Sequence, residues 1–246
     1  MEINSRIKGL LLFLGFSLIS MADGMGQRAA GNEGFTVHVG LEFSMLFQSE
    51  ALVSYEDTAL DSTGTYEFNA ESENSFRFGG YFRIALFRNH SLETGLYRLT
   101  RKYNSEVSLV STGERLGSNT IRGVAYEIPL VWTISVPVSE GGKMSTGFGG
   151  VASFFASDFG VFDLEYNLDA FIRSKFLPGI KANVGFEHNF GREGGVYIGA
   201  TFQHHFQSKA FLRMEYLEEA RPKAIGLLEL NASYFAAVVR YIFPMN

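Results

Sequence analysis

The clearest pattern in the chain is a run in which apolar residues alternate with polar or small ones. Apolar residues stand at every second position from Phe35 to Phe47, and the positions between them hold His38, Glu42 and Ser44 among others. Successive side chains of a strand point to opposite faces, so this run predicts a strand with one apolar wall. A tilted strand needs about nine to eleven residues to cross a bilayer, and this run is long enough.

The same alternation recurs along the chain and predicts eight strands. The seven later strands are expected at about 74–87, 92–103, 121–136, 143–156, 180–190, 196–203 and 227–243. The walls of the segment 92–103 cannot be assigned, because Leu92 and Leu96 alternate out of step with Tyr97 and Leu99. Proline cannot donate to a sheet ladder, so Pro129 predicts a local break in strand pairing.

Long and short connections alternate between these strands. The long polar ones span about 49–73, 104–120, 157–167 and 208–224, and the short ones lie at 88–91, 137–142 and 191–195. Outer-membrane barrels have long extracellular loops and short periplasmic turns. The pattern therefore predicts an all-β chain, an eight-stranded antiparallel up-and-down transmembrane β-barrel in the outer membrane, with both termini in the periplasm.

Charges on the polar walls indicate which wall faces outward. A soluble lipocalin-like barrel would place the apolar wall inside, and small barrels of both kinds can have eight strands. Here both charge signs and many glycines stand at mid-strand on the polar walls, which suits a narrow lumen better than a solvated exterior. The charged network expected to face the lumen comprises Glu42, Arg77, Arg83, Glu127, Lys181, Glu187 and Arg240.

This set of charges predicts a filled lumen. The interior of an eight-stranded barrel is only wide enough for side chains. Buried charges are costly unless they are paired, so we expect Glu42, Glu127 and Glu187 each to lie near an arginine or lysine. The alternative is a small passive pore for ions or small solutes, in which these carboxylates would stand unpaired beside a column of water.

The amino terminus has the features of a secretory signal. Basic residues precede an apolar segment at 10–19, and a small-x-small cleavage site follows at 20–22. The apolar segment is too short for a spanning helix of about twenty residues, although a retained membrane anchor is the alternative. The chain is therefore divided into a signal peptide, 1–26, and an outer-membrane barrel domain, 27–246.

Composition narrows the classes of function. The chain is 46% hydrophobic and 15% aromatic, but no later segment is continuously apolar over a helix-spanning length. The absence of cysteine excludes disulfides and thiolate metal sites. The net charge of −5 with mixed signs provides no basic stripe, so a nucleic-acid partner is not expected.

Few residues resemble a catalytic or metal-binding group. His204, His205 and Ser208 could serve an outer-membrane lipid-modifying enzyme, but adjacent strand residues point to opposite walls and no matching acid is identifiable. Acidic clusters at 56–61 and 67–73 do not have the spacing of a calcium loop and are interpreted as solvated loops. We therefore expect no enzyme activity, catalytic residue, metal or cofactor, with the lipid-modifying enzyme as the alternative.

Two motifs are similar to those of a known family. Tyr126–Leu130 reads Tyr-Glu-Ile-Pro-Leu, and Leu92–Tyr97 reads Leu-Glu-Thr-Gly-Leu-Tyr after a short turn, followed by Arg101 and Lys102. With the order of loops and turns, these motifs resemble the PorT-like outer-membrane β-barrel domain family of Bacteroidota over the whole mature chain. The resemblance implies a barrel in the outer membrane, in a family whose members serve secretion, envelope assembly or unassigned roles.

The last strand resembles an assembly signal. Phe235, Val239, Tyr241 and Phe243 stand at alternate positions, as in the carboxy-terminal signal that barrel-assembly machinery recognises, although three residues follow Phe243. The expected partners are therefore outer-membrane lipid, this machinery during biogenesis, and other envelope proteins. Together the patterns predict a structural or interaction component of the cell envelope.

Overall fold

The computed structural model describes most of the chain after its amino-terminal segment. The described residues are 36–47, 58–87, 89–155, 158–172, 174–206, 210–219, 221–230 and 233–244. The expected signal peptide, Phe35, Ser208 and the first part of the acidic cluster at 56–61 lie outside them. No helix in the described ranges has the length and apolar character that crossing a membrane requires.

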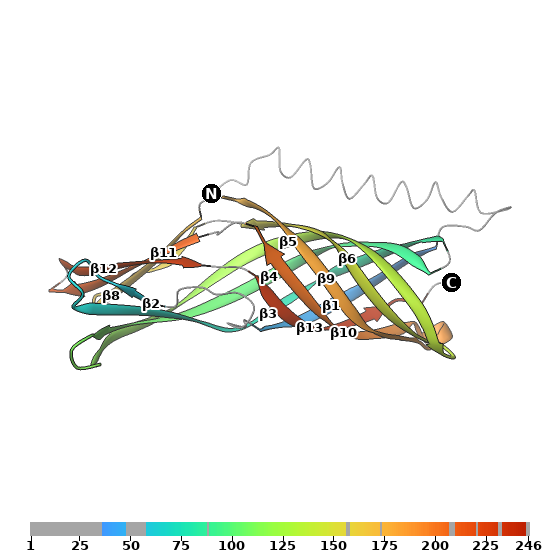
Figure 1. Ribbon diagram of the computed structural model, residues 1–246, viewed down its shortest axis with the longest axis horizontal. Helices are drawn as coiled ribbons and strands as arrows, with labels where there is room; N and C mark the ends of the chain where they lie inside the picture. Colours follow the sequence, from blue (N-terminus) through green and yellow to red (C-terminus); the bar gives the residue numbers. More distant parts are fainter. Residues whose placement is uncertain are drawn as a thin grey trace.

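Eight antiparallel strands close into a barrel. They are β1 (Val37–Phe47), β3 (Tyr66–Phe87), β4 (His90–Leu109), β5 (Arg115–Ser139), β6 (Gly142–Phe155), β9 (Phe176–Asn189), β10 (Gly195–His205) and β13 (Tyr234–Ile242). Each pairs with the next in this order, and β13 pairs with β1 to close the ring (Figure 1). The predicted eight-stranded up-and-down transmembrane β-barrel is confirmed.

The apolar wall of each barrel strand faces outward. In β1, Phe43 is 50% exposed, whereas its neighbours Glu42 and Ser44 are 1% and 0% exposed. The same division holds in β5, where Leu130 and Trp132 point outward and Thr133 is buried. A barrel with an apolar exterior and a polar interior suits a lipid bilayer, since a water-soluble barrel would expose its polar wall.

Three barrel strands continue past the barrel and form one layer of a β-sandwich. β3, β4 and β5 are 22, 20 and 25 residues long, and β2 (Thr58–Leu60) pairs with β3. The facing layer is a four-stranded sheet of β7 (Phe159–Val161), β8 (Tyr166–Ile172), β11 (Ala210–Glu218) and β12 (Arg221–Leu230). Figure 1 shows β8, β11 and β12 at one end of an elongated molecule and the strands β1, β6, β9, β10 and β13 toward the other.

The sandwich has a hydrophobic core of its own. The side chains that fill it come from both layers, and they are Phe68, Ala70, Tyr103, Val107, Ile121, Tyr166, Leu168, Ala170, Leu212, Met214, Ala224 and Leu228. The expectation that the connections 49–73, 104–120, 157–167 and 208–224 are long polar loops is therefore wrong for much of their described length. These segments alternate as strands do, but they bury their apolar residues and turn their polar residues to water.

The last predicted strand, 227–243, is also corrected. Its first residues belong to β12, which pairs with β11 in the sandwich, and its later residues form β13 in the barrel. The chain changes sheets because Leu228 packs in the sandwich core, whereas Ala236 and Val238 pack inside the barrel.

Two details of β4 and β5 answer questions that the sequence raised. Between the pairs Thr94↔Leu130 and Tyr97↔Glu127 the ladder from β4 to β5 has no paired residues, so the break predicted beside Pro129 is confirmed. The walls of β4 are also resolved, because Tyr97 is buried and Leu96 is exposed.

Candidate functional site

The seven charged residues predicted to face the lumen all lie inside the barrel. None of Glu42, Arg77, Arg83, Glu127, Lys181, Glu187 and Arg240 is more than 3% exposed. They project from β1, β3, β5, β9 and β13, each from the wall opposite the apolar residues. The barrel interior is therefore lined by both charge signs, drawn from five of its strands.

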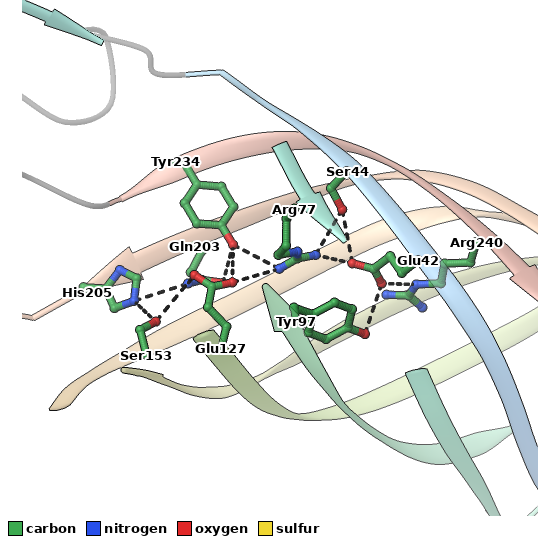
Figure 2. Close-up of polar contacts among 10 residues, drawn as sticks. All are labelled: Glu42, Ser44, Arg77, Tyr97, Glu127, Ser153, Gln203, His205, Tyr234 and Arg240. Atoms are coloured by element: carbon green, nitrogen blue, oxygen red, sulfur yellow. Dashed lines mark hydrogen bonds and ion pairs between the residues drawn. The ribbon is translucent and has the colours of Figure 1, made fainter. Parts of the chain in front are cut away.

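The part of this network nearest the sandwich is centred on Arg77. Its guanidinium lies between two carboxylates, forming an ion pair with Glu42 and another with Glu127, where Nη1 is 3.2 Å from Oε2. The hydroxyl of Tyr234 donates to the same Glu127 oxygen at 2.7 Å, and Gln203 Nε2 donates to the other at 2.7 Å. Both oxygens of Glu127 are thus satisfied although the side chain is fully buried (Figure 2).

The network continues to the opposite end of the barrel. Arg240 Nε donates to Glu42 Oε2 at 2.5 Å, and its Nη1 donates to Glu93 at 3.0 Å. Arg83 bridges Glu93 and Glu187 at 2.9 and 2.6 Å. Lys143 ends the series with its Nζ 2.9 Å from Glu187 Oε1.

These contacts form one chain of alternating charge. In spatial order its members are Glu127, Arg77, Glu42, Arg240, Glu93, Arg83, Glu187 and Lys143. Every carboxylate in the chain contacts a cation, which offsets the cost of burying its charge. We call this series the ion-pair chain.

Tyrosine rings fill the space between the charged groups. The Arg77 guanidinium lies 4.6 Å from the centre of the Tyr97 ring, and Arg240 lies 4.5 Å from the centre of the Tyr197 ring. The Tyr197 ring is seated against two residues that lack side chains, Gly185 and Gly199. Glycines on the polar walls therefore make room for large rings in a narrow lumen.

Lys181 is the member of the predicted set that stands apart. Among the described residues it forms no ion pair within 4.0 Å, and its Nζ lies 5.3 Å from the centre of the Tyr97 ring. The carboxylates of Glu42 and Glu127 attract its charge, and the guanidinium groups of Arg77 and Arg240 repel it.

Three charged residues of the lumen were not predicted. Glu93 and Arg101 are buried and lie on β4, the strand whose walls could not be assigned. Lys143 stands at the start of β6, where alternation has only begun. The motif Leu92–Tyr97 could have shown that Glu93 faces the lumen. Glu93 and Tyr97 are four residues apart, which is two periods of a strand, so both side chains lie on the same wall.

The histidines singled out in the sequence point to opposite walls. His205 lies inside, with Nε2 2.7 Å from Ser153 Oγ, and His204 lies outside, with Nδ1 3.1 Å from Ser233 Oγ. The carboxylate beside the inner pair, Glu127, contacts Ser153 and Gln203, so it sits on the serine side of the imidazole. A catalytic relay instead has the acid behind the imidazole.

A metal centre can also be tested against the geometry. In the part of the chain that the structure describes, no three histidine, aspartate or glutamate side chains are grouped as a metal ion would need. The acidic residue Asp61 is bound instead by the hydroxyl of Thr63 at 2.6 Å and by backbone N–H groups of its own turn.

Comparison with known proteins supports the fold. No family model matches the chain, and no curated protein sequence matches it. Among solved structures, it is similar to the outer membrane protein OprG from Pseudomonas aeruginosa, with a TM-score of 0.55 and 11% sequence identity. The match covers 85% of this chain and 96% of that one. The likeness shows a shared outer-membrane barrel fold, and the PorT-like resemblance stays a prediction.

Proposed function

We propose that the chain is an outer-membrane barrel protein with a side-chain-filled lumen that serves the cell envelope as a structural or interaction component. The observation that carries this proposal is the ion-pair chain, which runs through the barrel from Glu127 to Lys143 without a break. A polar solute could pass only by separating buried partners. Breaking such a pair by removing one partner costs about 3 to 5 kcal/mol, so the ion-pair chain acts as a fixed plug.

The position of the sandwich supports an interaction role. Outer-membrane barrels place their long connections outside the cell and their short turns in the periplasm. In that orientation the sandwich is extracellular. β1 then begins, and β13 ends, on the periplasmic side. Binding residues often lie on loops carried by a rigid scaffold, and here the connections are themselves folded around a core.

One turn of the sandwich presents apolar side chains outward. Phe162 and Leu164 are 71% and 79% exposed. Their turn is ordered, because the backbone N–H of Asp163 donates to Asn167 Oδ1 at 3.0 Å and Leu164 N donates to Asp163 Oδ1 at 2.6 Å. Exposed apolar side chains on an ordered turn are suited to contact an envelope protein partner.

Two measurements test this role. The purified protein in planar bilayers is expected to show no stable conductance, whereas open-channel conductance would favour the passive pore. The tagged protein, affinity-purified from native outer membranes and analysed by mass spectrometry, is expected to retain specific envelope proteins. The variant Phe162→Asp with Leu164→Asp should lose them, and the control Val110→Asp, altered at another sandwich turn, should keep them.

We also propose that β13 carries the assembly signal. Val239, Tyr241 and Phe243 are exposed on the outer wall, and the backbone N–H of Phe243 donates to Val39 O at 2.9 Å, so this strand seals the barrel. Tyr241→Ser with Phe243→Ser should reduce insertion in cells, measured by heat-modifiable migration of outer-membrane fractions. Leu41→Ser with Phe43→Ser on β1 is the control for lost lipid contact. Equal losses in both variants would argue against a signal.

A further inference from the structure

A pocket lies at the short-turn end of the barrel, apart from the sandwich. Its volume is about 120 Å³, and it opens beside the turn from β3 to β4 and the turn from β5 to β6. Seven polar side chains line it, namely His38, Arg83, Asn89, His90, Ser91, Ser135 and Lys143. All seven can donate a hydrogen bond, and no carboxylate is among the described residues that line the pocket.

Arg83 has a donor that the protein leaves unused. Its Nε bonds to Glu93 and its Nη1 bonds to Glu187, but the buried Nη2 has no hydrogen-bond partner among the described residues. The side chain is only 2% exposed. A buried donor without a partner costs free energy. Arg83 is among the residues that line the pocket, so the guanidinium that carries this donor borders the space that an acceptor would enter.

Lys143 adds donors beside Arg83. One of its contacts is to Glu187 Oε1 at 2.9 Å, and an ammonium group has three N–H donors. The Lys143 side chain is also partly exposed, at 32%, so it can reach a ligand at the mouth of the pocket. Ser91 and Ser135 contribute hydroxyl groups on the neighbouring strands β4 and β5.

The charged side chains that line the pocket favour an anion. They are Arg83 and Lys143, which both carry a positive charge. Glu93 and Glu187, the carboxylates nearest the pocket, are each already shared between two cations. The two carboxylates that contact Arg83 and Lys143 are therefore not among the described residues that line the pocket.

We propose that this pocket binds a phosphate group. A tetrahedral oxyanion presents several acceptors at once, which matches an arginine, a lysine and two hydroxyls converging on one space. A cavity needs about 10 to 15 Å³ of this kind of volume to hold one water, so a pocket of about 120 Å³ has room for a group of five heavy atoms. The source is either free phosphate of the periplasm or the headgroup of a phospholipid in the adjacent leaflet.

The first experiment uses the full mature chain, refolded in a maltoside detergent that contains no phosphate. Titration with inorganic phosphate at low ionic strength, followed by calorimetry, is expected to show saturable binding. Lys143→Gln should weaken it at least tenfold, and Ser135→Leu, which fills the pocket but keeps every charge, should abolish it. Lys223→Gln, on the exposed face of the sandwich, is the matched control and should bind as the unchanged protein does. Heat-modifiable migration checks that each variant is folded.

A second experiment distinguishes the two sources. Native mass spectrometry of protein extracted from outer membranes is expected to detect a bound phospholipid that Ser135→Leu lacks, if the headgroup is the ligand. Retained phospholipid with no binding of free phosphate would assign the headgroup, and binding of free phosphate alone would assign the ion. The proposal is overturned if the unchanged protein binds neither, or if folded Lys143→Gln and Ser135→Leu both bind as tightly as it does.

Discussion

Arg240 on the last barrel strand donates to Glu42 on the first, with Nε 2.5 Å from Oε2. The two residues are also directly opposite each other in the ladder that joins β1 to β13. The seam that closes the barrel is therefore held twice, by backbone hydrogen bonds and by a buried ion pair. Because Glu42 also contacts Arg77 on β3, one carboxylate ties together the strands on both sides of β1.

Glu42→Gln should destabilise the barrel strongly. The amide keeps the size of the carboxylate but removes its charge, leaving Arg77 and Arg240 buried without their shared partner. Loss of one partner of a buried pair costs about 3 to 5 kcal/mol. Urea unfolding in lipid vesicles, followed by the fluorescence of Trp132, measures the change, since this is the chain's one tryptophan.

The control for this variant is Glu73→Gln. Glu73 and Lys102 form an exposed pair with Nζ 3.9 Å from Oε2, and exposed pairs contribute about 0 to 1 kcal/mol. A loss at Glu42 no larger than that at Glu73 would mean that the ion-pair chain does not stabilise the closed barrel.

Gly185→Ala should disturb the lumen through the ring of Tyr197. A Cβ at position 185 would lie 2.5 Å from Cζ and Oη of that ring, which is closer than packed atoms approach. Overpacking of this kind costs about 1 to 3 kcal/mol. Gly80→Ala is the control, because a Cβ there meets no heavy atom within 4 Å. The same unfolding assay applies, and equal effects of the two alanines would show that the ring is not fixed against β9.

The residues that face the lumen can be predicted from the sequence where each wall of a strand stays either apolar or polar along its whole length. In β1, Glu42 stands between Leu41 and Phe43, so alternation alone indicates which side each takes. In β4 the outer wall changes character along the strand, from Leu92 and Leu96 in the barrel to polar residues such as Glu106 in the sandwich. Alternation of apolar and polar residues does not identify the two walls when the surroundings of one wall change from lipid to water along the strand.

The sandwich was missed for a related reason. In β3 the even-numbered residues are apolar toward both ends of the strand, but Phe68 points into the sandwich core and Phe78 points outward from the barrel. The ladder to β4 shifts register between Glu73 and Phe76, and this irregularity exchanges the two walls. A β-bulge inserts one residue without a distinctive sequence pattern, so the exchange becomes visible only in the structure.

Leu212→Ala should open the sandwich and leave the barrel closed. Leu212 is 0% exposed in the sandwich core, and such truncations cost about 2 to 5 kcal/mol. Limited proteolysis should cleave between β11 and β12 faster, while heat-modifiable migration stays unchanged. Leu164→Ala removes the same atoms from a side chain that is 79% exposed and should have no effect. Loss of the barrel in Leu212→Ala would show that the two parts fold as one unit.

The turn between β2 and β3 depends on an ionised aspartate. Asp61 accepts hydrogen bonds from the Thr63 hydroxyl at 2.6 Å and from the backbone N–H groups of Thr65 and Tyr66 at 2.8 and 2.9 Å. Burial opposes its ionisation, but these bonds outweigh burial and lower the pKa of Asp61 from 3.8 to about 2. The carboxylate form is therefore the one that the folded turn binds.

The turn should accordingly lose stability in acid. A carboxyl whose pKa is lower in the folded turn than in the unfolded chain stabilises the turn fully above the unfolded value, and this contribution disappears as the pH falls from about 4 to about 2. Amide hydrogen exchange at Thr65 and Tyr66, corrected for the intrinsic rate at each pH, should show protection decreasing across this window. Asp61→Asn should start with lower protection at neutral pH and show no such decrease. Protection that falls equally in both proteins would place the acid-sensitive group elsewhere.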